Sequence, residues 1–217
     1  NSWDGAALTI TVRNQEGSAK FSTIEDVLIR DNIINNAGEG VNILGKDDTY
    51  PSQTMKNLKI INNLFLDIGN KSFQGRGYFI QINGGSDILV ANNTVFNYGN
   101  IVSMHGDLPV NFIFRDNIVG HNEYGIHGHP AVKSSDGQKT FLNNVIVNNK
   151  NVTPSDVSFP SNNFWVSDYE SVGFVNYTQK NFSLSPNSRF KGKGADNSDI
   201  GSDPKSLPFE LSKWLLK

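Results

Sequence analysis

The stretch Val27-Leu-Ile-Arg-Asp-Asn-Ile-Ile-Asn-Asn-Ala-Gly-Glu-Gly-Val-Asn-Ile43 decides the fold, because approximate copies of it return along the chain. Each copy aligns on the second residue of an Asp-Asn or Asn-Asn pair. The copies are Val27–Ile43, Leu58–Ile82, Ile88–Met104, Phe112–Gly128 and Thr140–Asn149, anchored on Asn32, Asn63, Asn93, Asn117 and Asn144. Successive anchors are 31, 30, 24 and 27 residues apart, a period that predicts a solenoid.

The apolar residues inside one copy follow a β pattern rather than a helical one. Alternation of apolar with polar residues is visible around Val27, Ile29, Ile33, Val41 and Ile43. No stretch keeps the spacing of an amphipathic helix for long enough to form one. Each copy therefore predicts three short strands bent around a triangle, stacked on the next copy about 4.8 Å away as parallel sheets.

The second Asn of each pair is expected to serve two purposes at the first corner of its copy. Asn tolerates the left-handed backbone conformation that a sharp bend needs. Stacked Asn side chains can also hydrogen-bond to one another and satisfy backbone groups left inside the bend. The chain has 29 Asn among 217 residues, which suits such a stack. We expect Asn63 and Asn93, in the middle of the series, to matter for stability.

Several short segments carry a resemblance to a known class. They are the pentapeptides Arg30-Asp-Asn-Ile-Ile34, Ile61-Asn-Asn-Leu-Phe65, Ala91-Asn-Asn-Thr-Val95 and Arg115-Asp-Asn-Ile-Val119, together with the segments Gly-Val-Asn-Ile and Gly-Ile-His-Gly that follow such pairs. Over roughly residues 8 to 165 the chain resembles the right-handed parallel β-helix proteins of the pectate-lyase type, in particular bacterial proteins with β-helix repeats. The resemblance implies an all-β, single-stranded right-handed parallel β-helix of about six coils with a C-terminal cap. The class includes polysaccharide lyases, hydrolases, epimerases, phage tailspikes and adhesins, so the fold alone does not name an activity.

Two regions follow from this reading. Residues 1–165 are expected to form the solenoid, and residues 166–217 a closing segment and cap whose last part, 206–217, is an amphipathic helix over the C-terminal end. The segment Leu8-Thr-Ile-Thr-Val-Arg13 looks like the third strand of a coil whose first two strands are missing. We therefore expect an N-terminally truncated solenoid, with the missing part as a partner, unless Trp3 and its neighbours form the cap.

The composition of the chain limits the kinds of partner and bonding that we expect. The formal net charge is −2 and no basic stripe is present, which argues against nucleic acid. The chain has no Cys, so disulfides and thiolate metal sites are excluded. No apolar run of about 18 residues is present, so no membrane span is expected. The resemblance implies a secreted or cell-surface protein.

Insertions between the copies predict a groove over the third-strand sheet. Three of them follow the third strand and one precedes it: 13–23, 45–54, 129–139 and 69–77. Insertions on one face of a solenoid commonly mark the binding face. Because Val41 and Ile43 point inward, Asn42 points outward. The same register predicts two outward rows, Thr11, Asn42, Gln81, Ser103 and His127 in the first and Arg13, Leu44, Asn83, His105 and His129 in the second.

These rows contain the candidate site residues. His105 and His127 are the general acid–base candidates, and Arg13 is a further catalytic candidate, because lyases of the class use Arg or Lys as base and Ca²⁺ to neutralise the uronate. The sequence around Arg13 or Arg76 matches no lyase signature. Substrate-binding candidates are Asn42, Gln81, Asp47, Asp48, Arg76, Tyr78 and His129.

Each candidate has a structural alternative. Polar residues on an exposed strand can be merely solvated, and the Asp47-Asp48 pair can be a turn instead of a Ca²⁺ ligand shared with Asp107 and Glu39. Aromatic residues beside the loops can stack on sugars or pack against the solenoid: Tyr50, Phe73, Tyr78, Phe79 and Tyr124. The sequence thus predicts a protein that binds a polysaccharide or oligosaccharide, with lyase or hydrolase cleavage as its activity. The alternative is a non-catalytic scaffold or adhesion module. No cofactor is established, and calcium is the one candidate.

Overall fold

The chain forms three parallel sheets that it visits in turn. The computed structural model describes residues 5–69, 75–128, 140–153, 159–203 and 205–207. Sheet A contains, in spatial order, β1 (Ala6–Thr11), β4 (Glu39–Leu44), β7 (Ile80–Asn83), β10 (Val102–Met104) and β13 (Ile126–His127). Sheet B contains β14 (Phe141–Leu142), β11 (Val110–Arg115), β8 (Ser86–Ala91), β5 (Lys56–Ile61) and β2 (Glu25–Arg30). Sheet C contains β16 (Phe164–Val166), β15 (Val145–Val147), β12 (Ile118–Gly120), β9 (Thr94–Asn97), β6 (Leu64–Ile68) and β3 (Ile33–Ala37).

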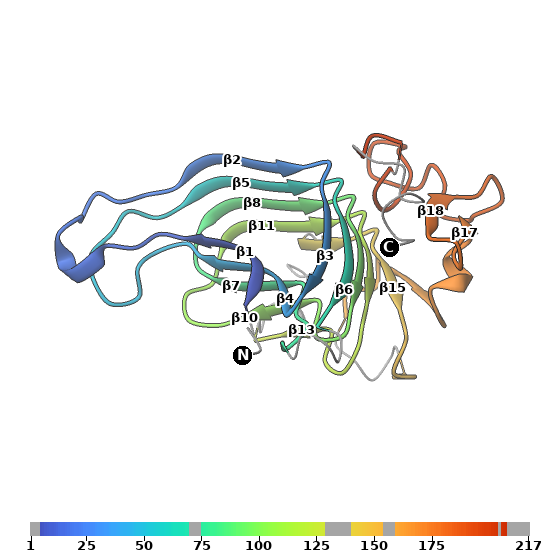
Figure 1. Ribbon diagram of the computed structural model, residues 1–217, viewed down its shortest axis with the longest axis horizontal. Coiled ribbons are helices and arrows are strands. Elements are labelled where there is room, and N and C mark those ends of the chain that lie inside the picture. Colours follow the sequence, from blue (N-terminus) through green and yellow to red (C-terminus); the bar gives the residue numbers. More distant parts are fainter. Residues whose placement is uncertain (1–4, 70–74, 129–139, 154–158, 204, 208–217) are drawn as a thin grey trace.

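The order of strands within the sheets confirms an all-β, repetitive chain with parallel sheets. Neighbours in each of these sheets are three strands apart in the chain until the last pair, β15 and β16, and they pair in parallel. Figure 1 shows the strands of successive repeats lying side by side. Among the described residues, the remaining elements are the antiparallel hairpin β17 (Phe174–Asn176) and β18 (Asn181–Leu184) and the 3-10 turns η1 (Gln15–Gly17) and η3 (Glu170–Val172).

The core lies between the three sheets and is filled by alternate residues of each strand. In β4, Val41 and Ile43 are buried while Asn42 between them is only half-buried. The rings of Phe65 and Phe79, from sheets C and A, meet edge to face with centroids 4.9 Å apart. Burying one such side chain contributes about 1.5–3 kcal/mol. Phe79 is fully buried, so of the two roles that the sequence left open for it, packing against the solenoid is the one observed.

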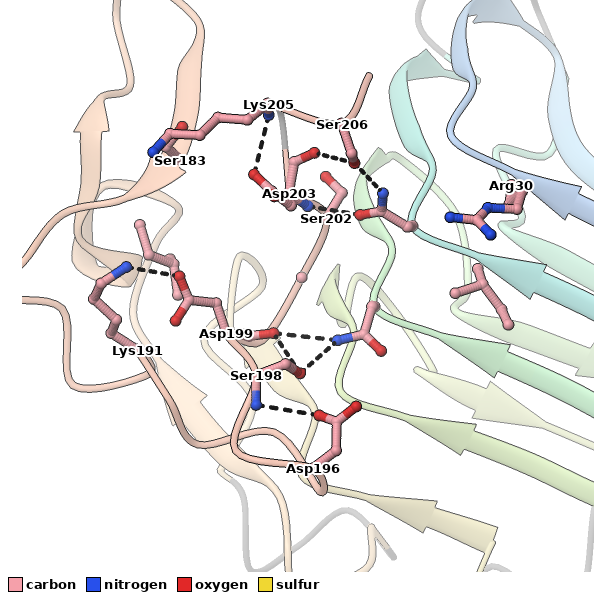
Figure 2. A pocket seen from close by; sticks show the side chains of 15 residues that line it. Arg30, Ser183, Lys191, Asp196, Ser198, Asp199, Ser202, Asp203, Lys205 and Ser206 are labelled. Carbon is pink, nitrogen blue, oxygen red and sulfur yellow. Dashed lines mark hydrogen bonds and ion pairs between the residues drawn. The ribbon is translucent and has the colours of Figure 1, made fainter. Parts of the chain in front are cut away.

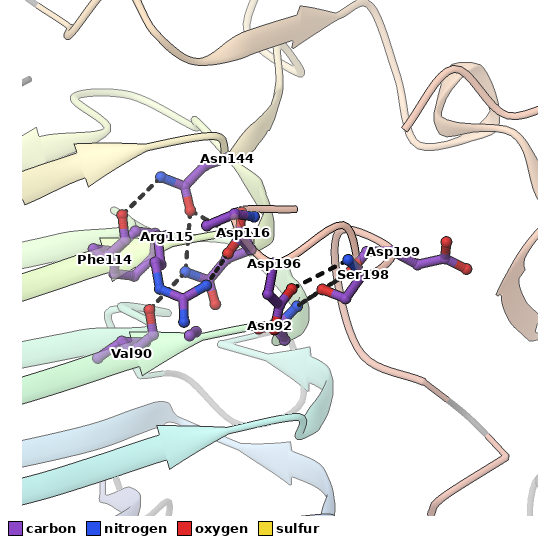
Figure 3. Close-up of polar contacts among 12 residues, drawn as sticks. Val90, Asn92, Phe114, Arg115, Asp116, Asn144, Asp196, Ser198 and Asp199 are labelled. Atoms are coloured by element: carbon purple, nitrogen blue, oxygen red, sulfur yellow. Dashed lines mark hydrogen bonds and ion pairs between the residues drawn. The ribbon is translucent and has the colours of Figure 1, made fainter. Parts of the chain in front are cut away.

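A ladder of Asn side chains runs along the inside of the corner between sheets B and C. Asn63 donates from its backbone N–H and its Nδ2 to Oδ1 of Asn93, at 2.9 and 3.0 Å. The same pair of hydrogen bonds links each Asn of the ladder to the next. The ladder consists of Asn32, Asn63, Asn93, Asn117, Asn144 and Asn163. Spare Nδ2 hydrogens bond to strand carbonyls, as from Asn144 to Phe114 at 2.9 Å (Figure 3). The predicted stack is confirmed, and its four inner members are completely buried.

The left-handed bend belongs to the residue before the ladder, not to the ladder residue itself. Positive φ angles of 52–59° occur at the first residue of each pair: Asp31, Asn62, Asn92, Asp116 and Asn143. The expectation that one Asn performs both tasks was therefore wrong. The first residue turns the chain and points outward, while the second turns its amide inward, where water cannot satisfy it.

The described tail, from Val166 to Leu207, packs on the outside of sheet C. Its apolar residues form a second core with outward side chains of that sheet, among them Leu64 and Leu66. The tail then runs back along the B–C corner. Gly201 donates its N–H to the carbonyl of Asp116 at 2.8 Å, and Asp203 to Oδ1 of Asn62 at 2.6 Å. Residues 208–217, expected to form a covering helix, and Trp3 lie outside the described residues.

Candidate functional site

One row of polar side chains crosses all five strands of sheet A in register. The backbone pairs Thr9 with Asn42, Asn42 with Gln81, Gln81 with Ser103, and Ser103 with His127. Thr9 and His127 are exposed, and the three residues between them are half-buried on the outer face. The sequence placed Thr11 in this row; the structure pairs Thr11 with Leu44, so the first strand enters two residues earlier than predicted.

The second row is shorter than the sequence suggested. Thr11, Leu44 and Asn83 are paired across β1, β4 and β7. His105 follows β10, is exposed, and donates its backbone N–H to the carbonyl of Ile82 at 3.0 Å. His105 thus occupies the position next to Asn83, on the same face as His127. The remaining predicted member, His129, lies outside the described residues.

Arg13, Asp47 and Asp48 join two loops to each other. Nη1 of Arg13 lies 2.5 Å from Oδ1 of Asp48. The buried carboxylate of Asp47 accepts backbone N–H groups from Tyr50, Asn14 and Thr49, each at 2.8 Å. These bonds hold the pKa of Asp47 below its ordinary value, and the Arg13 guanidinium does the same for the pKa of Asp48. Figure 1 shows these loops extending sideways beyond the sheets.

Two tyrosines flank the polar row on the side opposite those loops. Tyr78 is half-buried just before β7, and the guanidinium carbon of Arg76 lies 6.0 Å from its ring centroid. Tyr124 is 59% exposed, and its ring centroid lies 6.1 Å from that of His127. A hydrogen bond with Glu123 raises the pKa of Tyr124, so its hydroxyl stays protonated. An exposed aromatic ring therefore lies beside one end of the polar row.

The described residues do not form a metal centre. No group of three or more His, Cys, Asp or Glu among them is arranged to hold a metal ion. The oxygens of Asp47 are occupied by backbone N–H groups, which is the turn role that the sequence left open. The Ca²⁺ set of Asp47, Asp48, Asp107 and Glu39 therefore gains no support.

Two cavities lie away from sheet A, outside the predicted groove. One, of about 490 Å³, lies between the B–C corner and the tail, and is lined by polar groups such as Asn62, Ser202 and Asp203 (Figure 2). In its wall Asp199 pairs with Lys191 at 2.8 Å, and Asp196 accepts the N–H of Ser198 at 3.1 Å. Both Asp residues accept backbone N–H groups and stabilise turns of the tail. The other cavity, of about 440 Å³, lies on sheet C and is rich in aromatic side chains.

The fourth histidine is a buried structural residue. His121 is fully buried beside Trp165, with ring centroids 5.3 Å apart. Its Nδ1 lies 2.9 Å from the carbonyl of Asn122, while its Nε2 has no partner among the described residues. Burial lowers the pKa of His121, because the charged form would lose its hydration.

Comparison with protein-family models, curated proteins and solved structures finds no match to this chain. None of the described helices is long and apolar enough to cross a membrane.

Proposed function

We propose that the three sheets are the walls of a right-handed β-helix of about six coils whose sheet A binds an extended glycan. The three-strand period and the parallel pairing support the coil. Right-handedness follows from a general rule, since about 98% of crossover connections between parallel strands of one sheet are right-handed.

The observation that carries the binding proposal is the in-register row from Thr9 to His127. Parallel strands lie about 4.8 Å apart, so outward side chains from five strands span roughly 19 Å, the length of several sugar units. Amide, hydroxyl and imidazole groups both donate and accept hydrogen bonds, as sugar hydroxyls do. A repeated array of such groups suits a repeated ligand better than a compact one.

The aromatic flank adds the second contact that a sugar needs. Tyrosine rings offer an apolar face and a polar hydroxyl, so they can pack against the C–H side of a pyranose. Tyr124 and Tyr78 lie along the same border of sheet A, and Arg76 beside Tyr78 can bind a carboxylate or a hydroxyl.

Cleavage on this face would use His105 and His127, because histidine is the commonest general acid or base. Arg13 is held in the ion pair with Asp48, so the geometry favours a role in loop structure over proton transfer. A glycan-binding role also implies a secreted or cell-surface location, which cell fractionation would test.

Calorimetric titration with neutral and uronate hexasaccharides tests the proposal. We expect one class to bind and the Gln81→Ala/His127→Ala double variant to bind it at least tenfold more weakly. Lys59→Ala, which changes an exposed residue on sheet B, is the matched control and should keep full affinity. Release of new reducing ends or unsaturated products would identify cleavage. Absence of binding to every oligosaccharide would favour the scaffold alternative.

A further inference from the structure

A cavity on the outside of sheet C has the features of a ligand site. It measures about 440 Å³, within the range of small-molecule sites, and lies between β6, β9 and the tail that carries the hairpin β17–β18. Phe96 contributes to its floor, and Tyr98, Tyr169 and Tyr177 contribute to its walls. Figure 1 shows the hairpin beside sheet C, whereas the polar row described above belongs to sheet A.

The aromatic wall is fixed in place before any ligand arrives. The hydroxyl of Tyr169 donates to the carbonyl of Val95 at 2.7 Å. Its ring is nearly parallel to that of Tyr177, with an interplanar angle of 5° and centroids 6.3 Å apart. The ring of Phe96 lies 4.5 Å from that of Tyr169. Tyr98, by contrast, is 60% exposed and leaves an aromatic face open at the cavity. A preformed aromatic site loses little conformational entropy when a ring binds to it.

Two charged side chains at the same cavity have no hydrogen-bond or ion-pair partner in the described part of the protein. Asp67 and Lys180 both line it, and neither forms an ion pair or a side-chain hydrogen bond with another described residue. The hydroxyls of Tyr98 and Tyr177 are likewise available. The cavity thus combines apolar ring faces with hydrogen-bond donors and acceptors. These groups are complementary to a pyranose, which has an apolar C–H face and hydroxyls around its edge.

The charge around the cavity selects among sugars. Burial raises the pKa of Tyr177, and the negative charges of Glu170, Asp168 and the lining residue Asp67 raise it further. Among the described residues that line the cavity, Lys180 is the one cation. Since carboxylates outnumber cations here, a ligand carboxylate is repelled and a ligand amine is attracted.

We propose that this cavity binds a single neutral or amino-sugar ring, stacked on Tyr98 and Tyr177, with hydroxyls or an amine bonded to Asp67 and Lys180. The site is separate from sheet A and does not depend on glycan binding there. A terminal sugar or branch held at this site would anchor a polymer independently of its main chain.

Ligand-observed NMR with methyl glucoside, methyl glucosaminide and methyl glucuronide at roughly millimolar concentrations tests the proposal. We expect the first two to bind and the glucuronide to bind at least tenfold more weakly. Tyr98→Ala should weaken binding about tenfold with an unchanged melting temperature, because this side chain is mostly exposed. Asp67 has a left-handed backbone conformation, which Asn also tolerates, so Asp67→Asn removes the negative charge without straining the backbone. This variant should discriminate less strongly against the glucuronide.

Phe21→Ala, which removes an exposed aromatic ring outside both proposed sites, is the matched control and should leave monosaccharide binding unchanged. Conversely, Tyr98→Ala should leave hexasaccharide binding at sheet A unchanged, so the two sites fail or succeed separately. Failure of all three glycosides to bind, preference for the glucuronide, or equal losses in Tyr98→Ala and Phe21→Ala would overturn the proposal.

Discussion

The outer faces of sheets A and C belong to the same repeats yet have opposite surroundings. Outward positions of sheet A are polar and open, as at Gln81 and His127. Outward positions of sheet C are apolar and covered by the tail, as at Leu64, Ile118 and Val145. The corresponding sequences differ in kind: Val-Asn-Ile alternates, whereas Leu64-Phe-Leu66 and Val145-Ile-Val147 are continuous apolar runs. Continuous runs indicate strands buried on both faces. The covered face therefore supports the fold, and the open face is free to bind.

Removing the tail should have the largest effect on this contrast. A chain ending at Val166 would expose five apolar side chains of sheet C, each worth about 1.5–3 kcal/mol when buried: Leu64, Leu66, Ile118, Val145 and Val147. We expect it to be insoluble or aggregated in size-exclusion chromatography. A soluble, monomeric product with the full melting temperature would show that the tail does not stabilise sheet C.

The next largest effect is expected from a single substitution in the tail, whose cost in stability can be compared with that of a substitution on the open face of sheet A. Phe182→Ala removes a buried ring that packs against Phe96 with centroids 4.5 Å apart, and should cost about 3–5 kcal/mol in the free energy of unfolding. Gln81→Ala on sheet A should cost no more than about 0.5 kcal/mol. Urea denaturation measures both values, and similar costs would contradict the contrast between the faces.

The Asn ladder at the corner between sheets B and C gives the third prediction. Asn93→Ala removes bonds to Asn117 and to the carbonyls of Ile60 and Ala91, and leaves the donors of Asn63 without an acceptor. We expect a loss of about 2–3 kcal/mol. Asn42→Ala, an outward Asn of sheet A, is the matched control and should change stability by less than about 0.5 kcal/mol. Equal shifts in melting temperature for the two variants would reject the ladder.

The smallest effect concerns the buried His121 and the exposed His127. Because folding lowers the pKa of His121 below its unfolded value of about 6.5, the unfolded chain takes up the proton first as pH falls. The free energy of unfolding therefore keeps its full value above about pH 6.5. Below that pH it falls by up to about 1.4 kcal/mol per pH unit, because protons bind preferentially to the unfolded chain. Melting curves from pH 7.5 to 5 should show this slope in the wild type and in His127→Gln, but not in His121→Phe. An identical slope in His121→Phe would assign it to other groups.

Much of this architecture could be predicted from the sequence, because it depends on local patterns. The period of the Asn pairs predicted the repeat, and alternation at Val41, Asn42 and Ile43 predicted their orientation. Contacts between distant segments could not be predicted in this way. The register of β1, which places Thr9 instead of Thr11 beside Asn42, depends on how two loops pair. The ion pair of Arg13 with Asp48 depends on the same pairing of loops. The covering of sheet C had a signal in the apolar runs, but only the fold shows that the tail supplies the cover.

The central claim, that the open face of sheet A binds a glycan, is tested most directly by mapping a bound oligosaccharide residue by residue. We would titrate the hexasaccharide that binds into isotope-labelled Tyr98→Ala protein, in which the sheet C cavity is weakened, and follow backbone and side-chain NMR signals. We expect this binding to shift signals mainly in β4, β7, β10 and β13, with the side-chain amides of Asn42 and Gln81 and the imidazole of His127 among the largest shifts. Shifts confined to sheet B or to the tail, or no shifts with any oligosaccharide, would contradict it.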